Sequence, residues 1–496
     1  MSKPTRTNEE SKQIAALQDR VGIRESKLKN IVGNDYAALP KWDWPEDAMK
    51  IVKEAQKDAI KNRELVTRHI RDLYTWPSED LANEKVFLEG KGAFSTFTRS
   101  RAWFEEEGFH EFTTNYSFSN RWDKTYLPAT FLVPKVLVPG HKAPVMWYFH
   151  GGGYCTGASD GIPWYSQTAM RRAKNRGAIV IGIDYPLGPE GNYKDIVDSL
   201  GDFLAWYKAD KSFDPNHTSW TDWLYKQTPN LNYTLDKSSV YIEGESAGGQ
   251  AAVTTIWLNA KKGGPNLPID AALLRFPMIE HYTRSWEKSA NKQNKAVYMG
   301  LHCSKTEAEQ RVANIKAVIL DLERRGLVPT IPARYPPVGM AFAFLLSITG
   351  EWTWFFQRQH DERIHDMVAP TDTDFMDGLG RINNSVQDVV HECLPPMYVY
   401  HGHDDGNCPV EGTANFVNRL RELYPTRYGS EKGLVFHIVR VLAKKLEVAN
   451  PMTGELKTVE NATSVGHGFD YSLDEKNEKF LKEAYDWVGG FWGRNG

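Results

Sequence analysis

Beyond residue 109, short apolar runs alternate with stretches of helical periodicity, and this limits the possible folds more than any other feature. The apolar runs have the length of buried strands and lie at 145–149, 178–183, 240–242, 271–276, 397–400 and 434–439. Helical periodicity occurs between them, at 194–209, 250–262, 411–424 and 474–491. Strands that are apolar along their whole length are typical of a parallel sheet covered on both faces. The pattern therefore predicts an α/β fold with a mostly parallel central sheet and helices on both faces. Two further strands, at 112–118 and 126–133, are expected to flank a turn.

The alternation is interrupted by a long stretch of different character. It contains a basic helical segment at 305–325, a proline-rich turn at 329–337 and an apolar run at 338–348, followed by clustered aromatic residues. An insertion between two strands of an open sheet lies above their carboxyl ends, where such folds bind ligands. Residues 46–74 also carry one apolar helical face. Because one core rarely exceeds about 250–300 residues, a chain of 496 residues is either one core with additions or two domains, and the motifs described below favour one core with additions. The expected divisions are an N-terminal helical arm or cap (1–108), a first core segment (109–283), a cap or lid insertion (284–390) and a second core segment (391–496).

Composition excludes several classes of function. The chain has 60 lysine and arginine residues and 63 acidic ones, so its net charge of −3 does not favour nucleic acid as a partner. The run at 338–348 is too short to span a membrane, and residues 1–20 lack the apolar core of a signal peptide, which predicts a cytoplasmic chain. The four cysteines are scattered without a CxxC pair, and His401 and His403 lack a third ligand at a recognised spacing. We therefore expect no disulfide framework, no metal site and no cofactor.

The sequence GESAG at 244–248 follows the apolar run at 240–242 after one further residue and opens a predicted helix. In a strand–turn–helix context this pattern is a nucleophile elbow. Its flanking glycines permit a sharp turn that presents the hydroxyl of Ser246 at a helix N-terminus, where the helix dipole favours developing negative charge. The alternative is a serine in a glycine turn without a catalytic role.

A second glycine motif, HGGG at 150–153, follows the predicted strand at 145–149. Consecutive glycines allow main-chain N–H groups to face a ligand, and such donors stabilise the oxyanion of a tetrahedral intermediate. The amides of Gly152, Gly153 and Ala247 can together form an oxyanion hole. The alternatives are a flexible loop or a phosphate cradle, but no GxxxxGK[ST] or GxGxxG pattern accompanies the motif.

A serine nucleophile needs a base, and the base needs an orienting carboxylate. His467 stands on a glycine-flanked loop before the last predicted helix, so its ring can turn toward the carboxyl edge of the sheet. Asp404 and Asp405 both occupy the loop after the strand at 397–400. The spacing HGxxDxxxP favours Asp405 as the acid and leaves Asp404 as a supporting or turn residue.

Together these motifs resemble the α/β-hydrolase fold and, within it, the hormone-sensitive-lipase-like esterases. The resemblance rests on HGGGY at 150–154, DYPLGPE at 184–190 (similar to DYRLAPE in that family), GESAGG from 244 and HGF from 467. It implies that Ser246 is the nucleophile, His467 the base and Asp405 the orienting acid, with Gly152, Gly153 and Ala247 as oxyanion donors. Pro186 stands where that family usually has arginine. The spacings from Ser246 to Asp405 and from Asp405 to His467 are long for the family, which predicts an enlarged cap and an excursion at 443–464.

The expected function is hydrolysis of a carboxylic ester or lactone of a hydrophobic, fairly bulky small molecule through an acyl-enzyme on Ser246. Aromatic residues make up 12% of the chain, and we expect some of them to line the substrate pocket: Tyr154, Trp352, Phe355 and Phe356. Packing within the cap is the alternative role for the cluster at 352–356.

Three further possibilities stay open from the sequence. The same catalytic residues could serve an amidase or formamidase, an acyltransferase, or a non-hydrolytic enzyme of secondary metabolism. A ligand-binding receptor on the hydrolase fold is a different class, but such proteins often lack a triad member, and none is missing here. The expected partner is a small molecule, and the oligomeric state stays open, with a homodimer as one possibility.

Overall fold

The computed structural model describes residues 102–119, 125–279, 296–298, 301–324, 340–356, 389–442, 446–449, 456–459, 465–471 and 473–493. Apart from 102–108, the expected N-terminal arm or cap therefore lies outside the described residues. The same holds for the helix expected at 46–74, the proline-rich turn at 329–337 and much of the expected insertion.

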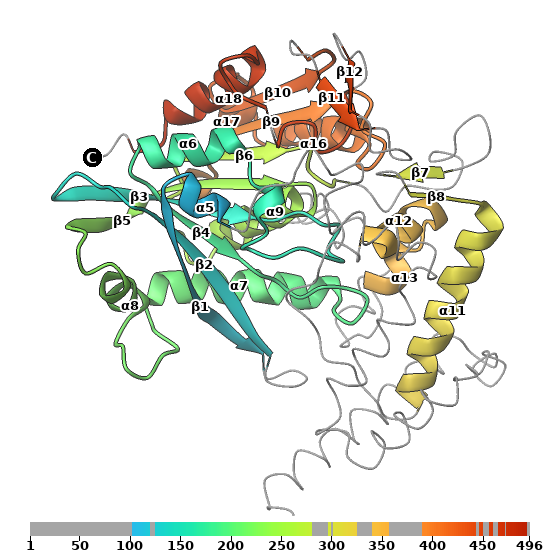
Figure 1. The fold of residues 1–496 in the computed structure, drawn as a ribbon, viewed down its shortest axis with the longest axis horizontal. Helices are drawn as coiled ribbons and strands as arrows, with labels where there is room; N and C mark the ends of the chain where they lie inside the picture. The colour runs from blue at the N-terminus through green and yellow to red at the C-terminus, as the bar shows by residue number, and fades with distance from the viewer. Residues whose placement is uncertain are drawn as a thin grey trace, which may run out of the picture.

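An eight-stranded sheet forms the centre of the molecule, in the order β1-β2-β4-β3-β5-β6-β9-β10 (Figure 1). Strands β4, β3, β5, β6, β9 and β10 are parallel, whereas β1 and β2 pair antiparallel with each other and β2 pairs antiparallel with β4. The strands are β1 (Phe109–Ser119), β2 (Thr125–Pro134), β3 (His141–Phe149), β4 (Ile179–Ile183), β5 (Tyr233–Glu245), β6 (Ala271–Arg275), β9 (Met397–Gly402) and β10 (Leu434–Val439). The predicted fold class, a mostly parallel sheet with helices on both faces, is confirmed.

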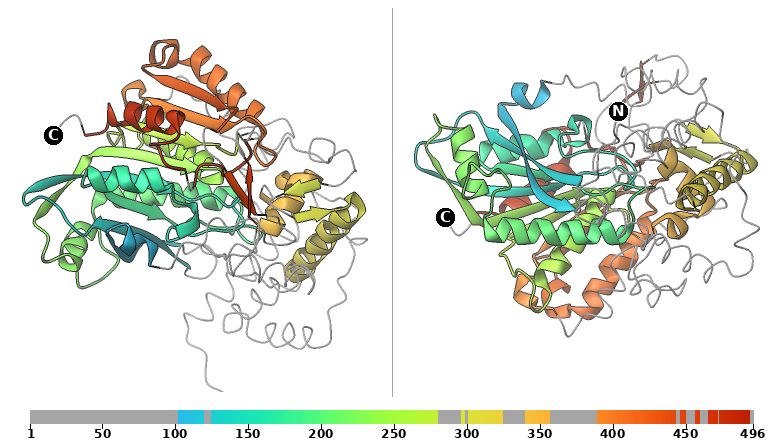
Figure 2. Two further views of the ribbon diagram at one scale, coloured as in Figure 1. Left: turned by 45° about the horizontal axis from the view of Figure 1, so that its top comes forward. Right: turned by 90° about the horizontal axis from the view of Figure 1, so that it is seen from below.

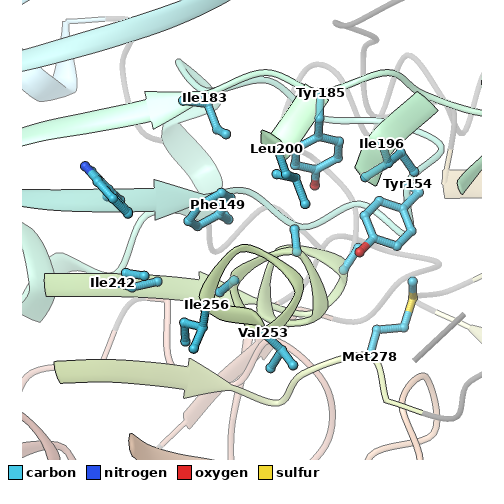
Figure 3. Packing of buried hydrophobic residues seen from close by; sticks show 14 of the residues in the cluster. Phe149, Tyr154, Ile183, Tyr185, Ile196, Leu200, Ile242, Val253, Ile256 and Met278 are labelled. Carbon is cyan, nitrogen blue, oxygen red and sulfur yellow. The ribbon is translucent and has the colours of Figure 1, made fainter. Parts of the chain in front are cut away.

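The apolar runs are explained by burial of both faces of the sheet. Along β3, Trp147 and Phe149 point into one hydrophobic cluster, while Met146 and Tyr148 point into a second cluster on the opposite face. Successive side chains of a strand alternate between faces, so a strand covered on both sides must be apolar at every position. Figure 3 shows part of the first cluster, in which Phe149 and neighbouring strand residues face α9 and α7.

Helices cover both faces (Figures 1 and 2). Helices α7 (Tyr193–Ala209), α8 (Trp220–Gln227), α9 (Ala247–Ala260) and α16 (Val410–Leu423) contribute to the first cluster, and α5 (Trp103–Glu106), α6 (Gln167–Asn175) and α18 (Lys479–Gly489) to the second. The core also contains a short helix, α17 (Pro425–Tyr428), and 3-10 turns at Ile162–Trp164 and His391–Cys393. The four predicted helices are confirmed, although α18 begins at Lys479 rather than at 474. Helices α6 and α8 were not expected.

The predicted insertion contains helices α11 (Lys305–Arg324), α12 (Met340–Thr349) and α13 (Trp352–Phe356) and a small pair of strands, β7 (Ala296–Tyr298) and β8 (Leu301–Cys303). In Figure 1, α12 and α13 lie beyond the carboxyl ends of the parallel strands. The excursion expected at 443–464 contains a second two-stranded sheet, β11 (Leu446–Ala449) and β12 (Leu456–Val459). Among the described helices, none is both long enough and apolar enough to cross a membrane.

Candidate active site

Ser246 occupies the sharp turn between the end of β5 and the start of α9. Its φ of 55° and ψ of −122° are unusual for a residue with a side chain and are typical of a strained nucleophile elbow. The glycines of the motif are sterically required, since a Cβ on Gly244 would overlap the carbonyl of Gly248, and one on Gly248 would overlap the carbonyl of Phe149. The turn is held by the neighbouring β6, because the Ser246 amide donates to the Arg275 carbonyl at 3.0 Å.

The structure brings Ser246, His467 and Asp405 together in one chain of hydrogen bonds. The Ser246 Oγ lies 2.9 Å from the His467 Nε2, and the His467 Nδ1 lies 2.7 Å from the Asp405 Oδ2. Asp405 follows β9, and His467 lies on the loop before α18. Three segments that are distant in sequence thus meet at the carboxyl ends of the parallel strands. The distances are those needed to pass a proton from a serine hydroxyl to an oriented imidazole.

Asp405 is buried and fully bonded. Its Oδ1 accepts hydrogen bonds from the amides of Asn407 and Cys408, both at 2.8 Å, and the His401 Nε2 lies 3.1 Å from its Oδ2. Burial raises the pKa of Asp405, but the charges and hydrogen bonds of His467 and His401 outweigh burial and hold that pKa well below its ordinary value. Asp405 is therefore a stable anion facing His467.

The second aspartate of this loop, Asp404, is in a different environment. Its carboxylate is 40% exposed and pairs with His403 at 2.9 Å, and its amide donates to the Val465 carbonyl at 3.0 Å. Asp404 therefore ties the loop after β9 to the segment that leads into the His467 loop. His401 is engaged with Asp405 and with Thr413, at 3.0 Å from the Thr413 Oγ1. Among the residues that the structure describes, no three metal-binding side chains are grouped together.

The His467 side chain is largely buried, with 7% of it exposed. The ring of Phe276 packs against it edge to face, with centroids 4.8 Å apart. Burial lowers the pKa of His467, but the negative charge of Asp405 dominates and raises that pKa well above the ordinary histidine value. The imidazolium that forms when His467 accepts a proton is thus stabilised by its carboxylate partner.

The HGGG loop has the backbone conformation that requires glycine. Gly152 and Gly153 have φ values of 103° and 59°, and a Cβ on Gly152 would overlap the carbonyl of Thr156. His150 lies flat against Tyr185, with ring centroids 4.3 Å apart, which fixes the start of the loop. Ala247 is the first residue of α9 and directly follows Ser246. The three proposed oxyanion donors therefore belong to the two glycine-rich turns next to the nucleophile.

The four aromatic residues expected near the substrate are buried, each exposed by 1% or less. Phe356 stacks on Trp352 with centroids 5.5 Å apart and lies 6.1 Å from Tyr154. Phe356 also lies against Gly188, where a Cβ would approach its ring to 2.8 Å. The helices α12 and α13 thus contact the loops of the core beside the HGGG motif, and Ala343 of α12 approaches a Cβ position on Gly153 to 2.9 Å.

Several polar residues near the site were not anticipated. They are the buried residues Glu245, Arg275 and Asp470. Glu245 precedes Ser246, the Arg275 carbonyl accepts a hydrogen bond from the Ser246 amide, and Asp470 lies on the loop of His467. Two of them had a signal in the sequence, since Glu245 is the variable position of the GxSxG motif and Asp470 stands three residues after His467.

The fold, with Ser246, His467 and Asp405 brought together at the carboxyl ends of its parallel strands, defines an α/β hydrolase. A family model described as alpha/beta hydrolase fold matches residues 146–317. A probable carboxylesterase, M8, from Phoma sp. is 30% identical over 361 residues, which cover 71% of this chain and 87% of that protein. The chain belongs to the hormone-sensitive-lipase-like carboxylesterase family of α/β hydrolases, as its motifs predicted. By class it is a carboxylic ester hydrolase.

More distant relatives are matched over shorter segments. Probable carboxylesterase 6 from Arabidopsis thaliana is 26% identical over 204 residues, and the chain spans only 48% of the length of that protein. A solved fungal esterase structure from Rhizomucor miehei is 15% identical, with a TM-score of 0.43 and coverage of 91% of this chain and 98% of that one. At such a score the structural likeness carries no argument about substrate.

Proposed function

We propose that the protein hydrolyses a carboxylic ester or lactone of a hydrophobic, fairly bulky small molecule through an acyl-enzyme on Ser246. The observation that carries this proposal is the hydrogen-bond chain from the Ser246 Oγ through both nitrogens of His467 to the Asp405 Oδ2. Such a chain activates a serine hydroxyl that is otherwise a weak nucleophile.

In the proposed reaction, the Ser246 Oγ attacks the substrate carbonyl carbon while the His467 Nε2 takes the hydroxyl proton. Asp405 holds the ring in the required orientation and stabilises the imidazolium. The amides of Gly152, Gly153 and Ala247 would receive the oxyanion, an interaction worth roughly 3–4 kcal/mol for a single donor. The imidazolium then protonates the leaving alkoxide. Water, deprotonated by His467, cleaves the acyl-enzyme and restores Ser246.

The size and polarity of the substrate are inferred from the aromatic residues beside the HGGG loop. Tyr154 of the core and Trp352, Phe355 and Phe356 of α13 form a continuous apolar cluster. We propose that residues 284–390, with the N-terminal region, form a cap, and that this cluster bounds the acyl or aromatic part of the substrate. Apolar surface of this kind favours neutral, hydrophobic ligands.

Labelling with an organophosphonate tests the nucleophile. The wild-type protein should become phosphonylated at Ser246, and Ser246→Ala should lose both labelling and roughly 10⁴–10⁶-fold of kcat. Ser199→Ala is a matched control, because Ser199 is similarly buried but its hydroxyl donates to the Ile196 carbonyl of its own helix, α7, at 2.7 Å. Failure of the wild-type protein to label, or full turnover by Ser246→Ala, would overturn the proposal.

Substrate class is tested with p-nitrophenyl esters of graded acyl length beside aryl esters and lactones. A roomy apolar pocket predicts that kcat/KM is maintained or rises with acyl size, since each buried methylene contributes about 0.8 kcal/mol. A steep loss with acyl length would refute the bulky-substrate proposal. Product analysis with and without an added alcohol or amine then separates hydrolysis from acyl transfer.

A further inference from the structure

Glu245, the residue before the proposed nucleophile, contacts two loops of the site at once. Its Oε1 accepts a hydrogen bond from the Gly151 amide, and its Oε2 accepts one from the Tyr471 hydroxyl at 2.8 Å. Gly151 belongs to the HGGG loop, and Tyr471 to the loop that carries His467. One carboxylate therefore connects the nucleophile elbow, the proposed oxyanion loop and the histidine loop.

Both contacts lie close to a group with a proposed role. Gly151 precedes Gly152 and is pressed against the carboxylate so closely that a Cβ on Gly151 would overlap it. Tyr471 packs against Gly468, the neighbour of His467, and a Cβ on Gly468 would approach the Tyr471 ring to 2.6 Å. A shift of the Glu245 carboxylate would therefore be passed directly to the oxyanion donors and to the base.

The position is an unfavourable one for an acid. Glu245 is completely buried, and within the described residues no lysine or arginine forms an ion pair with it. The nearby Arg275 is already bonded to Asp470 and Glu243. Burial raises the pKa of Glu245 to about 7, although Arg275 and the Tyr471 hydroxyl act in the opposite direction. A neutral or apolar residue would be easier to bury here, so stability alone does not explain a carboxylate.

We propose that Glu245 is a positioning residue, which sets the HGGG loop and the His467 loop in register with Ser246 through Gly151 and Tyr471. The proposal rests on the function proposed for Ser246, His467 and the glycine loop. Donors and base that are displaced by a fraction of an ångström still admit substrate but stabilise the transition state less well. The effect of losing these contacts therefore falls on kcat rather than on KM.

The test is a double-mutant cycle on steady-state kinetics. Glu245→Gln should lower kcat by roughly 10–100-fold with KM changed by less than about 3-fold, and Tyr471→Phe should lower kcat by roughly 3–10-fold. If both act through one hydrogen bond, Tyr471→Phe should have little further effect in the Glu245→Gln background. Tyr428→Phe is the matched control, since it removes a buried hydroxyl of α17 that donates to the Pro395 carbonyl at 3.0 Å and belongs to neither loop of the site. That variant should keep kcat within about 2-fold.

Independent, multiplicative effects of the two substitutions, or a Glu245→Gln variant with wild-type kcat, would overturn the proposal. If Glu245→Gln does not fold, the milder Tyr471→Phe still decides, because an unchanged kcat would contradict a positioning role. Phosphonate labelling separates this outcome from failure of the proposed function. Unlabelled wild-type protein refutes the role of Ser246, whereas equal labelling rates for wild type and Glu245→Gln refute only the role of Glu245.

Discussion

Two networks of buried polar side chains both lie close to the ring of Phe276, and they hold their charges in different ways. The Phe276 ring contacts His467 of the first network, with centroids 4.8 Å apart, and lies 5.6 Å from the Arg275 guanidinium of the second. In the first network, the Asp405 carboxylate is held by backbone amides and by His467, a group that can gain and lose a proton.

In the second network, Arg275 is a permanent cation between two acids. It binds the Asp470 carboxylate in a bidentate manner, at 2.7 and 3.0 Å, and Glu243 at 3.1 Å. Tyrosine hydroxyls complete the bonding of both acids, with Tyr400 donating to Asp470, and Tyr241 and Tyr485 to Glu243. Arg275 of β6 thus ties Asp470 of the His467 loop to the sheet through a fixed charge. The network with a titratable member is the one for which we propose proton transfer.

The largest expected effect is on the first network. Asp405→Asn should lower kcat by roughly 10³–10⁴-fold, because an amide neither stabilises the imidazolium nor maintains the required tautomer of His467. Steady-state kinetics on a p-nitrophenyl ester measures this loss. The adjacent Asp404→Asn is the control and should stay within about 3-fold of wild type, since the Asp404 carboxylate is exposed and bonded to His403. A larger loss in Asp404→Asn than in Asp405→Asn would reassign the acid.

A substitution in the second network should instead lower the stability of the folded protein. Arg275→Met leaves the carboxylates of Glu243 and Asp470 buried without a counter-ion, so we expect the free energy of unfolding to fall by about 3–5 kcal/mol. Denaturant unfolding measures this change, and Ser246→Ala, which removes a hydroxyl of the first network, should change it far less. An Arg275→Met protein as stable as wild type would show that the fixed charge does not anchor the loop.

A pH profile sharpens the comparison further. His467 must be neutral to accept the Ser246 proton, and its pKa is raised because the charge of Asp405 outweighs burial. Activity should therefore be present above the raised pKa and be lost as the pH falls through it. In Asp405→Asn the burial effect remains without the charge, so the acid limb of kcat/KM should move to lower pH. If the acid limb of kcat/KM lies at the same pH in wild type and in Asp405→Asn, a group other than His467 controls it.

The sequence predicted the residues of the first network but not those of the second. The strands and the residues Ser246, Asp405 and His467 stood out because apolar runs and glycine-flanked motifs follow directly from burial and turn geometry. Arg275 and Glu243 carried no such signal, since a charged residue in an apolar run is ordinarily expected at the surface. Helix α6 was missed for a related reason, because the buried face of its QTAMRRAKN sequence consists of a threonine, two alanines and a methionine, with no large branched or aromatic residue.

The smallest expected effect is at a partly exposed ion pair, which offers a third case for comparison. Lys316 of α11 binds Glu351 at 2.7 Å and lies 4.9 Å from the centre of the Trp354 ring of α13. Both charged side chains remain partly in water, so Lys316→Met should lower the free energy of unfolding by only about 0–1 kcal/mol. The buried apolar face of α11, which includes Val312 and Ile315, should keep the helix in place. A loss as large as that expected for Arg275→Met, measured by the same unfolding experiment, would mean that burial does not distinguish the two kinds of ion pair in this protein.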